Sequence, residues 1–273
     1  MLRRGLELRA VAPTRRQAWR TVILAVLMPT KEQIPALRAC PVAVTITGLG
    51  PVFVRDHSEM LVIHEVLIGD AYELDALPAD PALIVDLGAN VGVTLLEFHR
   101  RYPAARVVGY EAVANTYRLA RRNIAGVPNI EVRHAAVTTR EGECVVRTVR
   151  GASWAASIDF SGTEGPSDTG ETVPGVTLDA IIAELGDIDI LKLDIEGAEY
   201  AVLKACTSLS RIKLIVGEYH RDSGVAPETF FELLAQFEVT AGKLDGPHGR
   251  FSAVRRFREA DRASSGQRGG ELL

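Results

Sequence analysis

The segment Val85-Asp86-Leu87-Gly88-Ala89-Asn90-Val91-Gly92 decides the fold, because it carries an apolar run directly into a turn that contains two glycines. Apolar, β-branched runs of the same kind recur at residues 83–87, 106–110, 130–136, 188–193 and 213–217. Helical patterns separate them, near residues 92–101, 114–124, 178–186, 197–209 and 226–236. Continuous apolar strands that alternate with helices predict a parallel sheet covered on both faces, which is a doubly wound α/β fold.

Further strand patterns lie outside this alternation. Residues 238–244 and 251–257 have no helix between them, which predicts an antiparallel hairpin at one edge of the sheet. Upstream, residues 42–54 predict another hairpin, and a capped helix follows it up to residue 68. Near residues 141–143 a tight turn is expected to join two short strands. The polar stretch 159–175 has almost no large apolar residue, which predicts either a lid over a site or a disordered segment.

Composition and charge limit the classes of partner. The chain has 273 residues, 31 basic and 35 acidic side chains and a net charge of −4, so no global field favours nucleic acid. Residues 1–38 are basic, which indicates either an anionic partner or simply a solvated helix face. The apolar run 22–28 is too short to span a membrane and predicts a helix packed on the main domain. Three cysteines without a C-x-x-C pair favour the cytoplasm.

These patterns divide the chain into three regions. Residues 1–50 form a basic, helical extension together with the start of the first hairpin, residues 51–258 form the main α/β domain, and residues 259–273 form a disordered tail. The basic and apolar N-terminal segment could act as a lid or as the arm of a homodimer.

Ligands of doubly wound sheets bind at the carboxyl ends of the strands, which directs attention to the turn after residue 87. Gly88 and Gly92 let the backbone approach a ligand closely, but their G-x-x-x-G spacing differs from the G-x-G-x-x-G of a pyrophosphate cradle. Asp86 would repel a diphosphate and attract an ammonium group. The turn therefore favours a cationic cofactor that carries an amino acid, of which S-adenosylmethionine (SAM) is the common one. An NAD(P)-binding oxidoreductase on the same fold is the alternative.

Acidic residues follow the other strands. Glu111 ends the second strand, where a carboxylate can accept both hydroxyl groups of a ribose. The fourth strand ends in Lys192-Leu193-Asp194-Ile195-Glu196-Gly197-Ala198-Glu199, and strand alternation puts Lys192 and Asp194 on one face. Such a group of carboxylates is costly unless it meets a metal, a cation or donors, although Glu196 and Glu199 could merely favour a helix N-terminus. Glu218 and His220 share a face at the end of the fifth strand.

These motifs, together with Asn115, Asn123 and Thr177-Leu178-Asp179, resemble the FkbM-type methyltransferases over residues 52–245. The resemblance implies a Rossmann-like class I fold, with seven strands and a reversed terminal hairpin. It also implies SAM-dependent O-methylation of hydroxyl groups on sugars, glycosides or other natural-product intermediates. The cofactor-binding residues that it implies are Tyr72, Asp86, Gly88, Ala89, Asn90, Gly92, Glu111, Ala112, Ala136 and Asp194.

Methylation of an alcohol requires activation of a poor nucleophile, and two hypotheses supply it. In the first, His220 is the general base, and Asp194 and Glu218 orient it or the acceptor. In the second, Asp194 and Glu218 bind Mg²⁺, which lowers the pKa of the hydroxyl. The residues alone do not decide between them. A non-catalytic subunit that retained the fold is a further alternative. Acceptor contacts are expected from Trp154 and the segment 159–175.

Overall fold

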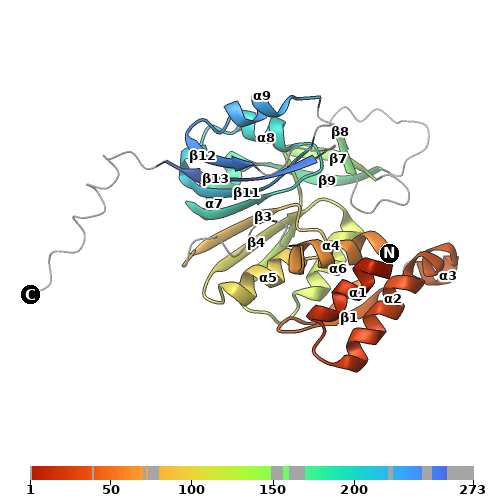
Figure 1. Ribbon diagram of the computed structural model, residues 1–273. Coiled ribbons are helices and arrows are strands. Elements are labelled where there is room, and N and C mark those ends of the chain that lie inside the picture. Colours follow the sequence, from red (N-terminus) through yellow and green to blue (C-terminus); the bar gives the residue numbers. More distant parts are fainter. Residues whose placement is uncertain are drawn as a thin grey trace, which may run out of the picture.

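The structure, a computed structural model, describes residues 2–38, 40–69, 72, 80–148, 156–159, 170–220, 224–241 and 248–256. In this part of the chain the main sheet has seven strands, in the order β12-β13-β11-β10-β3-β4-β5 (Figure 1). The parallel strands are β3 (Leu83–Leu87), β4 (Arg106–Glu111), β5 (Ile130–His134), β10 (Ile188–Leu193) and β11 (Ile212–His220). At the edge, β13 (His248–Arg255) runs antiparallel to β11 and to β12 (Phe237–Ala241). The predicted α/β fold with its terminal hairpin is confirmed.

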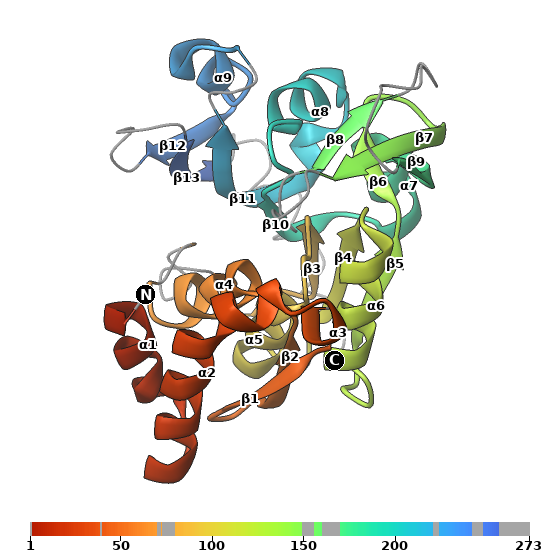
Figure 2. The same cartoon turned by 90° about the vertical axis from the view of Figure 1, so that its right-hand side faces the viewer.

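Helices cover both faces of this sheet (Figure 2). On one face, apolar side chains such as Ile84 and Ile190 pack with α4 (His57–Leu67), α5 (Val93–Arg101) and α6 (Ala114–Asn123). On the other, Val85 and Leu191 pack with α7 (Leu178–Leu185), α8 (Glu199–Ala205) and α9 (Pro227–Glu232). Because alternate residues of a strand point to opposite faces, Asp86 lies on the face of Ile84, the side that α4 covers.

The N-terminal segment packs on the first of these faces. It comprises α1 (Leu2–Glu7), a 3₁₀ turn (Leu8–Val11), α2 (Arg15–Gln33) and α3 (Pro35–Arg38). Val22, Ala25 and Met28 of α2 are buried, so the prediction of a packed helix over 22–28 is confirmed. Among the described helices, none combines the length and the apolar character that a bilayer span requires.

The opposite side of α2 is apolar and open to solvent. Trp19, Ile23 and Leu27 are exposed there, and the homodimer expected from this segment stays a prediction. The boundary predicted after residue 50 falls inside the hairpin of β1 (Val42–Ile46) and β2 (Gly50–Val54). Since Met28, Val54 and Leu214 belong to one apolar core, the predicted division at this point also remains open.

A second sheet, absent from the predictions, branches from β5. The run 130–136 was expected as one strand, but β5 ends at His134 and the chain re-enters a strand as β6 (Ala136–Thr138). The second sheet has the order β6-β9-β7-β8, with β7 (Gly142–Thr148), β8 (Ala156–Asp159) and β9 (Gly170–Thr177). No glycine, proline, asparagine or aspartate interrupts residues 130–138, so the sequence carries no turn signal for a change of strand partner, which explains the error.

The expected lid over 159–175 needs a correction as well. Residues 170–175 belong to β9, where Val173 packs in the core of the second sheet, so they form neither a lid nor a disordered segment. The turn expected near residues 141–143 does join two strands, β6 and β7, but both pair with β9 rather than with each other. Trp154, residues 160–169 and the tail 259–273 lie outside the described residues.

Candidate active site

The turn after β3 is held against the end of β10. Gly88 has a φ of +83°, and its N–H donates to the carbonyl of Tyr110 in β4 over 3.0 Å. A Cβ at this position would lie 1.9 Å from the carbonyl oxygen of Asp194. Only glycine therefore allows the turn to pack on Asp194 without displacing backbone. This close approach brings the two candidate binding segments together.

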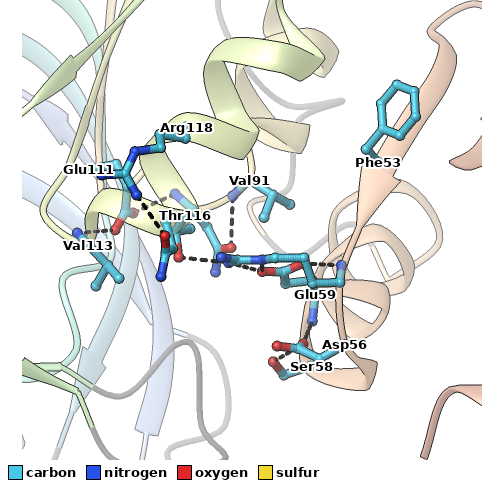
Figure 3. A network of polar contacts seen from close by, with 12 residues as sticks. Phe53, Asp56, Ser58, Glu59, Val91, Glu111, Val113, Thr116 and Arg118 are labelled. Atoms are coloured by element: carbon cyan, nitrogen blue, oxygen red, sulfur yellow. Dashed lines mark hydrogen bonds and ion pairs between the residues drawn. The ribbon is translucent and has the colours of Figure 1, made fainter. Parts of the chain in front are cut away.

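Glu111 ties the same turn to the end of β4. Its two carboxylate oxygens accept the N–H groups of Asn90 over 2.9 Å and of Val113 over 2.8 Å, the second of which is visible in Figure 3. Burial raises the pKa of Glu111 to about 7, against the lowering effect of these two hydrogen bonds. Each carboxylate oxygen can accept a further hydrogen bond, so the pair of hydroxyls expected from a ribose fits the chemistry of this position.

A buried group of charges, the Lys192 cluster, lies beside this turn and consists of Tyr72, Asp86, Lys192 and Asp194. Lys192 and Asp86 are register partners in neighbouring strands, and the Lys192 Nζ lies 3.0 Å from the Asp86 Oδ1. The same ammonium donates to the carbonyl of Gly88 over 2.7 Å and lies 3.7 Å from the Asp194 Oδ2. The Tyr72 hydroxyl donates to that Asp194 oxygen over 2.9 Å.

Burial raises the pKa of Asp86 to about 6, although Lys192 lowers it. The carboxyl groups of Asp86 and Asp194 in turn hold Lys192 protonated against the effect of its burial and raise its pKa. At neutral pH the cluster therefore contains the ammonium of Lys192 and the ionised carboxylate of Asp86. Asp86 has no exposed surface, and its charge faces Lys192. Asp194, one-fifth exposed, carries the uncompensated charge that can face a ligand.

A second group, the His220 cluster, comprises Asp194, Glu196, Glu199 and His220. The imidazole Nδ1 of His220 lies 2.9 Å from the Glu199 Oε1, and its Nε2 lies 3.3 Å from the Glu196 Oε2. Glu199 is buried at the start of α8 and accepts the N–H of Ile195 over 2.9 Å. Donor atoms of Asp194, Glu196 and His220 all lie within 4.8 Å of one another.

The protonation of His220 bears on its predicted role as general base. Burial lowers its pKa, but the hydrogen bond to Glu199 and the nearby carboxylates overcome this and raise the pKa to about 9. An imidazolium cannot accept a proton. The base role of His220 therefore stays a prediction, and the contacts of the imidazole do not favour it.

Glu218, the third predicted catalytic residue, has a different partner. Its Oε1 lies 3.0 Å from the Arg250 Nε on the neighbouring strand β13. Among the described residues, the group that could hold a metal contains Glu196 and His220 with Asp194, and Glu218 is outside it. Burial raises the pKa of Glu65 in α4, which the sequence did not single out, and the nearby charges of Glu218 and Asp194 add to this effect.

The remaining predicted cofactor residues line the turn or the start of the second sheet. Ala89 is buried and donates its N–H to the Tyr110 carbonyl, and Gly92 precedes α5 with a φ of +83°. Ala112 accepts a hydrogen bond from the ring of His134 through its carbonyl oxygen. Ala136 is buried in the core of the second sheet. The structure thus gathers Asp86, Gly88, Asn90, Glu111 and Asp194 closely, and leaves Ala136 facing a protein core.

A polar network holds this site to the N-terminal hairpin and α4 (Figure 3). The side-chain amide of Asn123 accepts the N–H of Phe53 over 2.8 Å and donates to the carbonyl of Val91 over 2.8 Å. Arg55 pairs with the buried Glu59 and donates to the Thr116 hydroxyl. Asn123, one of the residues that carry the family resemblance, therefore links the turn after β3 to strand β2 of the N-terminal hairpin.

A family model described as the methyltransferase FkbM domain matches residues 86–241, from β3 to the end of β12. The match spans more than half of the chain. This chain belongs to the FkbM methyltransferase family. It is an S-adenosylmethionine-dependent methyltransferase, and the resemblance inferred from its motifs is confirmed.

Two curated proteins are similar to this FkbM methyltransferase. Methyltransferase sdnD of Sordaria araneosa is 24% identical over 231 residues, which are 71% of this chain and 87% of sdnD. The AMB antimetabolite synthetase AmbE of Pseudomonas aeruginosa is 28% identical over 206 residues, 60% of this chain but 10% of AmbE. Among solved structures, a methyltransferase from Geobacter sulfurreducens is 19% identical with a TM-score of 0.43, covering 73% of this chain and 87% of that one.

Proposed function

We propose that this FkbM methyltransferase transfers the methyl group of SAM to a hydroxyl oxygen of a small molecule, such as a sugar, a glycoside or another natural-product intermediate. The observation that carries the proposal is the position of Asp194, which belongs to both the Lys192 cluster and the His220 cluster. One cluster adjoins the turn that suits the cofactor, and the other offers polar groups to an acceptor. A donor and an acceptor bound on either side of Asp194 would be close enough for methyl transfer.

The residues around the first cluster fit SAM. Gly88 lets the turn pack directly on the Asp194 backbone, which brings the turn and the Asp194 side chain to one place. The negative charge of Asp194 would attract an ammonium or sulfonium group. Glu111 and the Asn90 turn suit the ribose end. When bound there, SAM supplies an electrophilic methyl group. The buried Lys192 keeps Asp86 ionised and holds the Gly88 carbonyl, so the turn keeps its shape while the cofactor enters and leaves.

On the acceptor side, the His220 cluster supplies hydrogen-bond partners for a hydroxyl group. Asp194 and Glu196 can accept a hydrogen bond from it, and His220 lies beside both carboxylates. Glu218 and Arg250 lie further along the same face and suit other polar groups of the acceptor. The two names among the similar proteins, a methyltransferase and an antimetabolite synthetase, support an acceptor among small metabolites.

A screen of hydroxylated acceptors tests this function. Full-length protein would be incubated with SAM and panels of sugars, glycosides and other hydroxylated metabolites, with S-adenosylhomocysteine release and the mass of the product as readouts. We expect turnover for a subset of alcohols, loss of turnover in Asp194→Asn, and normal turnover in Asp187→Asn, which lies at the opposite end of β10. Methylation confined to amines or carbon atoms contradicts the proposal.

Two binding results would favour one of the two alternative functions, an NAD(P)-dependent oxidoreductase or a non-catalytic subunit. Saturable binding of NAD(H), with no binding of SAM, favours an oxidoreductase. Binding of SAM without turnover of any alcohol in the panel, in the presence of candidate protein partners, favours a non-catalytic subunit. Calorimetric titration of SAM and NAD(H) into the same preparation separates the first case directly.

A further inference from the structure

Three residues at the carboxyl edge of the sheet combine the donor types of a cation site. Asp194 follows β10, Glu196 lies in the turn before α8, and His220 ends β11. One oxygen or nitrogen of each lies within 4.8 Å of the others, and all three side chains are half-buried. Two carboxylates and an imidazole suit first-row divalent cations such as Mn²⁺, and the two carboxylates also suit Mg²⁺.

Glu199, which lies outside this set of three, orients the imidazole. Its Oε1 accepts a hydrogen bond from the His220 Nδ1 over 2.9 Å. Its two oxygens also accept hydrogen bonds from the N–H groups of Ile195 and Gly197. These contacts fix the carboxylate and hold a proton on Nδ1, while Nε2 is directed toward Glu196. An ion that binds Nε2 would displace the proton that this nitrogen carries in the imidazolium form. Imidazole ligands of metals in proteins commonly donate their second N–H to a carboxylate in this way. The arrangement therefore has an outer partner as well as candidate ligands.

The charge at this edge also points to a cation. Asp86, Asp194, Glu196 and Glu199 face the single ammonium of Lys192 and the imidazole of His220. Asp86 and Glu199 are almost fully buried, so this excess of negative charge is costly without a further cation. Lys192 already compensates Asp86, and its ammonium donates to the carbonyl of Gly88.

We propose that Asp194, Glu196 and His220 bind a divalent cation of the Mg²⁺ and Mn²⁺ class. The site differs from the pair Asp194 and Glu218 expected from the sequence, since Glu218 is bound by Arg250. Three protein donors leave positions of a six-coordinate ion open to water and to a substrate oxygen. Binding of the ion stands on its own, whereas its use in catalysis rests on the proposed function.

In that use, the ion withdraws electron density from the hydroxyl of the acceptor and lowers its pKa. The hydroxyl proton passes to water, and the oxygen forms a bond to the methyl carbon. The bond between that carbon and sulfur breaks, and its electron pair stays on sulfur. The products are a methyl ether, S-adenosylhomocysteine and a proton taken up by water. This route requires no proton acceptance by His220, whose two ring nitrogens both face carboxylates.

The test uses Mn²⁺ as a probe, because its paramagnetic resonance signal changes when it leaves the aquo state. Metal-depleted full-length protein would be titrated with Mn²⁺, with and without SAM, and the bound ion would be displaced with Mg²⁺. We expect one saturable site per chain. Glu196→Gln and His220→Gln should abolish it, and Glu199→Gln should weaken it by about 10–100-fold because the outer partner of the imidazole loses its negative charge. Circular dichroism would check that each variant is folded.

Two matched variants give the contrast. Asp187→Asn, at the other end of β10, and Glu218→Gln, on the same face but outside the three ligands, should retain the Mn²⁺ site. No saturable site in the native protein overturns the inference, and so does loss of the site in Glu218→Gln with retention in Glu196→Gln. Alcohol methylation that is unaffected by EDTA overturns the metal's catalytic use and leaves the proposed function standing. A Mn²⁺ site without alcohol methylation supports the ion and contradicts the proposed function.

Discussion

The Lys192 cluster and the His220 cluster share Asp194 but differ in their source of positive charge. In the first, the chain itself supplies a buried ammonium, which lies 3.0 Å from Asp86 on the neighbouring strand. In the second, carboxylates surround His220, whose charge depends on its protonation, and its members other than the buried Glu199 are only half-buried. The difference indicates a permanent, structural ion pair on one side and a place for exchangeable cations on the other.

The largest expected effect comes from removing the internal cation. Lys192→Met leaves the Asp86 carboxylate buried without its partner, and loss of one partner of a buried ion pair destabilises a fold by about 3–5 kcal/mol. Urea unfolding of the full-length chain measures it. Adding Asp86→Asn to Lys192→Met should restore part of the loss, because no buried charge then remains.

Lys213→Met is the matched control for this prediction. Lys213 also pairs with an aspartate, Asp189, but its side chain is 52% exposed, so its removal should cost about 0–1 kcal/mol. If the two lysine variants lose the same stability, the Lys192 cluster is not a structural ion pair, and the contrast between the two clusters is lost.

The next effect concerns Gly88, which brings the turn after β3 onto the residue that both clusters share. Gly88→Ala places a methyl group 1.9 Å from the Asp194 carbonyl oxygen, so either the turn or Asp194 must move. We expect calorimetry to detect no SAM binding in this variant. Gly126→Ala has a similar φ of +80° with open space around it, and should only lose about 1–2 kcal/mol of stability through the left-handed backbone. If both variants bound SAM with equal affinity, the close approach to Asp194 would not be the reason that glycine is required at position 88.

Local sequence pattern could predict which residues meet at this edge, but not which of them pair. The rule that ligands bind at the carboxyl ends of parallel strands located Asp86, Asp194 and His220 together. Lys192 can pair with Asp86 because β10 lies next to β3 in the sheet. The spacing of apolar residues along the sequence does not reveal the order of the strands in a sheet, so this pair could not be predicted. Alternation correctly put Lys192 on the face of Asp194, as their 3.7 Å separation requires.

The partner of His220 illustrates the same limit. Alternation along β11 suggested Glu218, whereas the imidazole contacts Glu199, which comes from the first turn of α8. A contact between a strand end and a helix start depends on the turn between β10 and α8, in which Glu196 has a φ of +54°. Short-range patterns do not encode such a turn. The motif thus identified the carboxylates, and only the three-dimensional arrangement assigned their partners.

The smallest expected effect is a pH dependence at Glu111, a carboxylate with neither a lysine nor a histidine in direct contact among the described residues. Burial raises its pKa to about 7, compared with about 6 for Asp86, which has Lys192 beside it. Hydroxyl donors of a ribose favour the ionised form, so SAM binding should lower the pKa of Glu111 and release a proton. SAM affinity should then rise as the pH increases, by about tenfold between pH 6 and 8. In Glu111→Gln, calorimetry should find weaker binding without this rise. A rise of equal size in Glu111→Gln would assign the titration to another group, such as Asp86. It would also show that the cation beside Asp86 does not make its pKa differ from that of Glu111 in the way expected.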